Sequence, residues 1–166
     1  MNKFRKTATG ILAVLLAGVG YYVVTPNGDK VILPSPTTIG VINSSVTQAN
    51  IQQTICTSGY TATIRPSASY TTALKKRQLA TVYSYYSDKS LGSYEEDHLI
   101  SLELGGNPTA EANLWPEPYA GIYGARVKDQ VEDKLHRMVC TNQITLAAAQ
   151  LAISSNWYEA KVRYTK

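Results

Sequence analysis

The sequence is poor in cysteine and in excess charge, and it contains no internal repeat. Its 166 residues include two cysteines and carry a net charge of +4. Two cysteines 84 positions apart do not make a zinc-binding motif. Three basic residues lie within the first six positions, and leaving them out takes the net charge from +4 to +1. Overall charge is therefore weak evidence for a polyanionic partner.

Phenylalanine is almost absent, with one residue, whereas there are twelve tyrosines. Tyrosine tolerates positions that are partly exposed to solvent, because its ring can pack while its hydroxyl stays hydrogen-bonded. Apolar residues make up 44% of the chain, so a core is expected. The length favours one folded domain.

The N-terminus has the composition of an export signal. A basic start, MNKFRK, precedes an apolar run from Ala8 to Val24, which is the order found in secretory signals. The run is also close to the shortest helix that spans a membrane. We interpret residues 1–24 as a signal peptide or a retained N-terminal membrane anchor that contacts the membrane. Either alternative places the rest of the chain outside the cytoplasm, in the periplasm or secreted.

An even number of cysteines in an exported chain indicates a disulfide. A Cys56–Cys140 bond would close a loop of about 85 residues, with a stabilisation on the order of 4–5 kcal/mol in the chain-entropy model. The alternative is two free, buried thiols.

The rest of the chain divides into a linker and a domain. Residues 25–46 are rich in Pro, Ser, Thr and Gly, which is typical of a linker, and a short strand is expected at Lys30–Leu33. Residues 47–166 are expected to form the domain, opening with a short helix capped by Thr47. The segment from Tyr60 to Ile64 alternates apolar and polar residues, which predicts a half-buried strand.

Three later stretches have the apolar spacing of helices. Residues 69–86 form the first, with Ser69 or Thr71 as the expected cap. The second begins between 119 and 125 and ends near Cys140, and the third covers about Thr145–Ser154. A single apolar stripe on the second helix consists of Val127, Val131, Leu135 and Met138.

The most informative segment runs from Tyr94 to Pro118 and reads YEEDHLISLELGGNPTAEANLWPEP. It contains Asp97 next to His98, a Gly-Gly turn, and Asn113 fifteen positions after the histidine. The segment predicts a strand from 94 that leads into a second short strand or turn by 104. The part around Trp115 is expected to be a rigid packed loop. With the helix that follows, this is a ββα order.

An acidic residue beside a histidine can supply a cation site and a proton acceptor within one residue of each other. A neutral imidazole suits the role of base at neutral pH. Strict strand alternation would place the side chains of Asp97 and His98 on opposite faces. The strand must therefore end or bend at this pair.

These motifs resemble the core of HNH endonucleases, the ββα-metal or His-Me finger family. The residues that carry the resemblance are Asp97-His98, Leu99 to Leu102, Gly105-Gly106 and Asn113-Leu114. A wider pattern resembles a group of exported bacterial HNH-like proteins over about residues 54–160. It comprises TIC at Cys56, IRP at Arg65, NLWPEP, KD-x-x-E from Lys128 to Glu132, and VC at Cys140.

The resemblance implies a small α+β protein with a ββα core and flanking helices. It implies hydrolysis of phosphodiester bonds in DNA, with RNA as a second substrate class, assisted by a divalent metal ion. Magnesium is expected first, and Mn²⁺ or Zn²⁺ are the alternatives. His98 would be the general base, Asp97 a metal ligand, and Asn113 the residue that fixes the loop. Further expected roles are a second metal ligand for Asp129, phosphate contacts for Lys128 and Arg65, and support for Glu96 and Glu132.

The chain departs from the family pattern at two positions. Ser101 stands where the motif commonly has proline, and Ile122 stands where a helix His or Asn is expected. Asp129 and Glu132 are the best substitutes, although acidic residues on this helix are equally typical of a solvated face. His136 is interpreted as a helix-end residue rather than a ligand. A second hypothesis is therefore an envelope-associated binding module that keeps the fold without catalysis.

Overall fold

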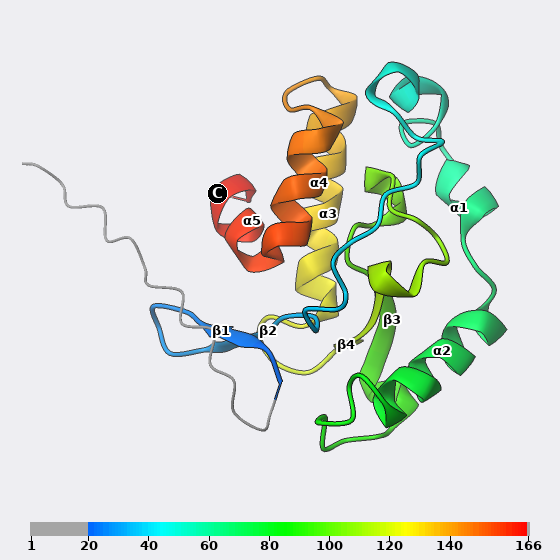
Figure 1. Ribbon diagram of the computed structural model, residues 1–166. Coiled ribbons are helices and arrows are strands. Elements are labelled where there is room, and N and C mark those ends of the chain that lie inside the picture. Colours follow the sequence, from blue (N-terminus) through cyan, green and yellow to red (C-terminus); the bar gives the residue numbers. More distant parts are fainter. Residues whose placement is uncertain (1–19, 166) are drawn as a thin grey trace, which may run out of the picture.

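The computed structural model describes residues 20–165 and has the α+β fold predicted from the sequence (Figure 1). Most of the predicted export segment, residues 1–19, lies outside the described chain. The described residues form two separate antiparallel sheets, each with two strands. The first pairs β1 (Tyr22–Val24) with β2 (Lys30–Ile32), and the second pairs β3 (Tyr94–His98) with β4 (Leu114–Pro118).

The second sheet and the long helix after it form a ββα unit. In the β3–β4 register, Asp97 lies opposite Trp115 and His98 lies opposite Leu114. Helix α3 (Ala125–Cys140) packs against β3. β3 ends at His98, in line with the expectation that the strand ends or bends at the Asp-His pair.

The second strand of this unit lies later in the chain than predicted. Residues Leu102–Leu104, where a strand or turn was expected, form a 3₁₀ turn. The strand is instead Leu114–Pro118, where a rigid loop was expected. Within residues 20–165, β4 pairs on one side only. Its two prolines are tolerated because an edge strand does not use every backbone N–H in hydrogen bonds to a neighbouring strand.

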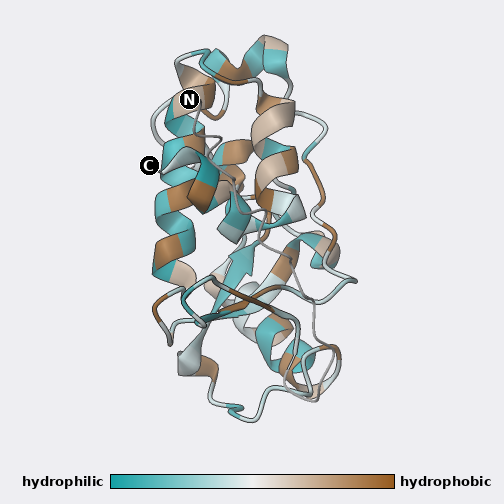
Figure 2. Ribbon diagram, turned by 90° about the vertical axis from the view of Figure 1, so that its left-hand side faces the viewer, coloured by the Kyte–Doolittle hydropathy of each residue, from teal (hydrophilic) through white to brown (hydrophobic). Residues whose placement is uncertain are grey.

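Two further helices pack against α3 of this unit. Val131 and Leu135 of α3 are fully buried, as the apolar stripe predicts. Helix α4 (Leu146–Ser155) begins at the expected cap, where the Thr145 hydroxyl accepts a hydrogen bond from the Ala148 N–H at 3.1 Å. Helix α5 (Trp157–Tyr164) then packs against α3 and α4. In Figure 2 hydrophobic and hydrophilic bands alternate along the helical ribbons.

The predicted disulfide is confirmed. Cys56 and Cys140 are bonded and connect the segment after the 3₁₀ helix Gln48–Gln53 to the end of α3. A disulfide fits an oxidising compartment. Within residues 20–165, no helix has both the length and the apolar character needed to cross a bilayer.

The interpretation of residues 25–46 as a linker is wrong. Val31 and Val46 are buried in the main core, and the Ser35 N–H donates to the Tyr83 hydroxyl at 3.0 Å. Val23, in the last part of the predicted export segment, is buried in the same core. This stretch holds its place through a few buried apolar side chains, which its Pro- and Ser-rich composition does not reveal.

Two local predictions before β3 are also corrected. Residues Tyr60–Ile64 form a short helix, α1, instead of a strand. Alternation over five residues is compatible with both structures, because Tyr60 and Ile64 are also one helical turn apart. Helix α2 (Ala68–Ala80) is capped by Ser67, whose hydroxyl accepts from the Tyr70 N–H, and it ends before the expected residue 86. It packs against both β3 and β4.

Candidate functional site

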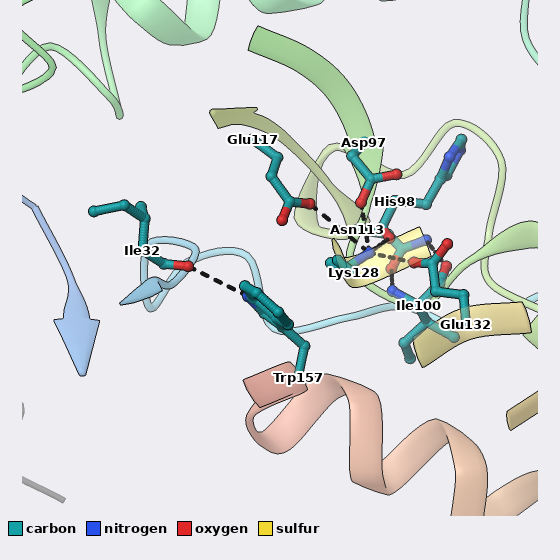
Figure 3. A network of polar contacts seen from close by, with 9 residues as sticks. All are labelled: Ile32, Asp97, His98, Ile100, Asn113, Glu117, Lys128, Glu132 and Trp157. Atoms are coloured by element: carbon teal, nitrogen blue, oxygen red, sulfur yellow. Dashed lines mark hydrogen bonds and ion pairs between the residues drawn. The ribbon is translucent and has the colours of Figure 1, made fainter. Parts of the chain in front are cut away.

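A lysine ammonium group lies at the centre of the ββα unit (Figure 3). Lys128 of α3 is 0% exposed. Its Nζ donates a hydrogen bond to Asp97 Oδ2 at 2.5 Å and another to the His98 carbonyl oxygen at 2.8 Å. It also donates to the carboxylate of Glu132, one turn further along α3. All three N–H donors of the ammonium group are thus used.

Strand β4 brings a third carboxyl group toward the same lysine. Glu117 Oε2 lies 4.0 Å from Lys128 Nζ, and the glutamate is 1% exposed. Burial raises the pKa of Glu117 well above its ordinary value, although the charge of Lys128 opposes this shift. The carboxyl group is therefore held neutral at pH values where an exposed glutamate is ionised.

The pKa shifts of Asp97 and Lys128 favour the charged form of both partners. Burial alone would raise the pKa of Asp97, but the charge of Lys128 outweighs it and the net shift is downward. Burial alone would lower the pKa of Lys128, but Asp97 and Glu132 raise it well above its ordinary value. Asp97 and Lys128 are therefore both charged at neutral pH.

His98, at the end of β3, is 4% exposed and has a defined tautomer. Its Nε2 lies 3.0 Å from the carbonyl oxygen of Pro108. Because a carbonyl oxygen can only accept, Nε2 carries the proton and Nδ1 of the neutral ring is the proton acceptor. Burial lowers the pKa of His98, so the ring is neutral at pH 7. This is the state that a general base requires.

Asn113 holds the loop between the two strands, as predicted. Its Oδ1 accepts from the Ile100 N–H at 3.0 Å, and its Nδ2 donates to the Ile100 and Asn107 carbonyl oxygens at 3.0 Å each. Asn113 thus joins the start of the loop to the residue before Pro108. Its Oδ1 also accepts from the Val41 N–H at 3.3 Å, and none of these side-chain hydrogen bonds goes to His98, so Asn113 orients His98 through the loop that carries Pro108.

The Gly-Gly turn is required by close packing in this loop. A Cβ atom at Gly106 would lie 1.7 Å from the Ile100 carbonyl oxygen and 2.9 Å from Asn113 Nδ2. Gly105 has a φ of +73°, in the left-handed region that favours glycine. Both glycines are therefore needed for the turn that Asn113 closes.

Two further predicted site residues line a pocket of about 190 Å³ beside Glu132. Arg65, just after α1, is exposed there and contributes to the lowered pKa of His98 through its charge. Asp129 of α3 also lines the pocket, and its pKa is raised by partial burial and by the charge of Asp97. The fold therefore brings Arg65 and Asp129 to one pocket, close enough to the Asp-His pair for Arg65 to act on His98 and for Asp97 to act on Asp129 through their charges.

Glu96 does not support His98 by a hydrogen bond. Within residues 20–165, neither of its carboxylate oxygens has a hydrogen-bond partner. Burial raises the pKa of Glu96 to about 8, and the charges of Lys75 and Arg77 on α2 act in the opposite direction. Glu96 thus belongs to the side of the hairpin that faces α2.

Two predictions about α3 and the residues before it need correction. Lys128 was expected to contact a substrate phosphate, but its complete burial prevents this. Ile122, at the expected ligand position, is 64% exposed and precedes the first residue of α3. The α3 side chains that contact one another and Asp97 are instead those of Lys128 and Glu132.

The carboxyl groups of Asp97, Glu117 and Glu132 are the kind of oxygen donors that Mg²⁺ prefers. The position between them, however, is filled by the Lys128 ammonium group, which uses Asp97 Oδ2 and Glu132 Oε1. The residues present therefore do not fit a divalent ion held between these carboxylates. The predicted metal role of Asp97 and Asp129 stays a prediction.

A different group has the spacing of metal ligands. Within residues 20–165, Cys56, His136 and Cys140 are the only three potential ligands whose donor atoms all lie within 4.8 Å of one another. The two sulfur atoms are joined in the disulfide and are not thiolate ligands. The His136 Nε2 also lies 2.9 Å from the Ile55 carbonyl oxygen.

Comparisons with family models, with curated proteins and with solved structures found no match to this chain. Sequence reasoning missed Glu117 and the Pro108 carbonyl group. The position of Glu117 two residues after Trp115, in a β-strand, is the signal that could have identified the glutamate as buried.

Proposed function

We propose that this protein is an HNH-like endonuclease that hydrolyses phosphodiester bonds of DNA outside the cytoplasm, with RNA as a second substrate class. The observation that carries the proposal is the state of His98. Its Nε2–H is directed to the Pro108 carbonyl oxygen, which leaves Nδ1 as the proton acceptor of a neutral ring. The DH, GG and NL motifs around it support the same reading.

In the proposed reaction, His98 Nδ1 removes a proton from a water molecule as the water oxygen attacks phosphorus. The bond between phosphorus and the leaving ester oxygen breaks, and that oxygen takes a proton from solvent. Asn113 maintains the base by holding the loop that carries Pro108. Arg65 is the exposed cation near His98 that would bind the phosphate oxygens.

The family resemblance leads us to expect a divalent ion, with Mg²⁺ favoured over Mn²⁺ and Zn²⁺. The proposed proton transfer to His98 does not require that ion. The position between the nearest carboxylates is taken by Lys128. The cleavage assay therefore distinguishes a metal-dependent nuclease from a metal-independent one.

The proposal is tested by cleavage of supercoiled plasmid with the purified, oxidised protein. The reaction is run with Mg²⁺, Mn²⁺, Zn²⁺ and EDTA, beside the His98→Ala variant. Loss of a general base is expected to reduce cleavage by about 10²–10⁴-fold. The matched control is His136→Ala, which removes the other histidine of the chain with its contacts to the Ile55 carbonyl oxygen and to Glu103, and which leaves Asp97, His98 and Lys128 unchanged.

The pH dependence supplies an independent check. Because burial lowers the pKa of His98, the base stays unprotonated to a pH below the ordinary histidine value of about 6.5. Cleavage should therefore fall only when the pH drops below about 6.5 and should be constant just above it. Cleavage by His98→Ala equal to that of the unaltered protein would falsify the role of this base.

A second function, binding without catalysis, is favoured by a specific observation. His98 is 4% exposed, and the Asp97 carboxylate is held by Lys128. A nucleic acid would then bind at Arg65 and dissociate unchanged. Plasmid that is retarded in a gel but never nicked, under every ion tested and with folded protein, would identify this alternative.

A further inference from the structure

We propose that the Lys128 ammonium group is the resident cation of this site and stands in the position that a divalent metal ion would otherwise take. The protein would then bind no divalent ion between Asp97, Glu117 and Glu132. The binding part of this inference is independent of the proposed nuclease activity. Its consequence for catalysis, cleavage in the presence of a chelator, rests on that activity.

The contacts of Lys128 are those of a bound cation. Oxygen atoms approach Nζ from four separate positions on β3, β4 and α3 (Figure 3). They belong to Asp97 at 2.5 Å, the His98 carbonyl group at 2.8 Å, Glu132, and Glu117 at 4.0 Å. A surface lysine would not need this set, because solvent would satisfy its donors.

Burial explains why the lysine stays in place. An ammonium group that is 0% exposed loses its hydration, and the adjacent carboxylates replace the water as hydrogen-bond acceptors. A metal ion that entered would have to displace this charge into a region without water. Occupation by the lysine is therefore incompatible with occupation by a divalent ion.

The His98 carbonyl contact links this cation to the proposed base. Lys128 holds the carbonyl oxygen of the last residue of β3, while the ring of the same residue is held by Pro108. The ammonium group thereby fixes the backbone of His98 and balances the charge of Asp97. We assign Lys128 as a positioning residue, since complete burial keeps it from touching a substrate.

The first test uses the unaltered protein. A buried, hydrogen-bonded ammonium group exchanges its protons slowly, so Lys128 should give a resolved ¹H–¹⁵N ammonium signal. Mg²⁺, Mn²⁺ or Ca²⁺ at about 10 mM should shift the melting temperature by less than about 1 °C relative to EDTA, and Mg²⁺ should leave the signal unchanged. A rise of several degrees, or a signal that disappears on addition of Mg²⁺, would overturn the proposal.

The second test removes the lysine. Lys128→Ala opens space among the carboxyl groups, whereas Lys128→Met removes the charge and fills the space. Only the alanine variant should gain stabilisation by Ca²⁺ or Mn²⁺, a rise of roughly 5–10 °C when the ion is at about 100 times its dissociation constant. Equal responses of the two variants would contradict the proposal. If the alanine variant does not fold with or without ion, the ammonium signal of the unaltered protein decides.

The cleavage assay distinguishes the two proposals. Cleavage by the unaltered protein in EDTA supports both the nuclease function and the lysine as the resident cation. Cleavage that requires a divalent ion keeps the function and overturns the lysine proposal. No cleavage in any condition overturns the function, and the two binding tests above still decide the cation.

Discussion

Two carboxylates that are adjacent in β3, Glu96 and Asp97, are both largely buried and yet have opposite pKa shifts. Burial raises the pKa of Glu96 to about 8, because the charges of Lys75 and Arg77 offset only part of it. At Asp97 burial acts in the same direction, but contact with the Lys128 ammonium group reverses the shift. The comparison teaches that a direct partner, and not burial, decides which acid is ionised on each side of the hairpin.

The largest effect is expected from removing the partner on the Asp97 side. Lys128→Ala leaves buried carboxyl groups without their cation and should lower the free energy of unfolding at pH 7 by about 3–5 kcal/mol. Lys75→Ala, the matched change on the Glu96 side, removes one hydrogen bond to the Tyr94 carbonyl oxygen and should cost about 0.5–1.5 kcal/mol. Denaturant unfolding measures both, and similar losses would mean that the two sides do not differ.

Asp97→Asn should destabilise the protein by about 2–3 kcal/mol at pH 7, because the amide carries no charge to pair with Lys128. The folded pKa of Asp97 is lowered, so its contribution is present above the unfolded value of about 3.9 and is lost as the pH falls through the folded value. The difference between the two proteins should therefore shrink in acid. Unfolding curves between pH 2 and 7 test this, and a difference independent of pH would argue against the ion pair.

Glu96→Gln should have the opposite sign. The folded pKa of Glu96 is raised to about 8, so its contribution to stability is present below the unfolded value and is lost as the pH rises toward 8. The glutamine variant should be more stable than the unaltered protein at pH 8, by on the order of 2 kcal/mol, and similar at pH 4. Glu111→Gln, at an exposed pair with Arg77, is the control and should change stability by less than about 1 kcal/mol.

The smallest effect on stability is expected at Arg65, which is exposed. Arg65→Ala should change the free energy of unfolding by less than about 0.5 kcal/mol. If it binds the phosphate, KM for cleavage should rise about tenfold, the equivalent of one charge-assisted hydrogen bond. Arg77→Ala, which lies on the Glu96 side, should leave KM unchanged. Equal KM values for both variants would remove Arg65 from the substrate site.

The parts of the site that could be predicted lie close together in the sequence. His98, the Gly-Gly turn and Asn113 fall within sixteen residues, and the loop between them is closed by hydrogen bonds of Asn113 itself. The apolar stripe of α3 and the Thr145 cap of α4 could likewise be predicted from the sequence, because helix periodicity and capping are local properties. The prediction of a strand at residues 60–64 was wrong, because an alternation over five residues does not distinguish a strand from a helix.

The environment of Lys128 could not be predicted in this way. Lysine and glutamate four residues apart on a helix are typical of an exposed ion pair, and the sequence predicts a solvated face or a phosphate contact. Burial of this pair depends on where β3 and β4 lie against α3. The role of Glu117 could not be predicted for the same reason. It depends on strand β4, which places Glu117 Oε2 4.0 Å from Lys128 Nζ.

The sequence by itself determined the α+β class, the α3 and α4 helices, the Cys56–Cys140 pair and the loop that presents His98. Each depends on spacing along the chain or on a residue type with few alternatives. The tertiary structure decided which charges are buried together, because desolvation and ion pairing depend on distances between separate elements. It placed Lys128 among three carboxyl groups and left Glu96, one residue from Asp97, without a hydrogen-bond partner in the described chain.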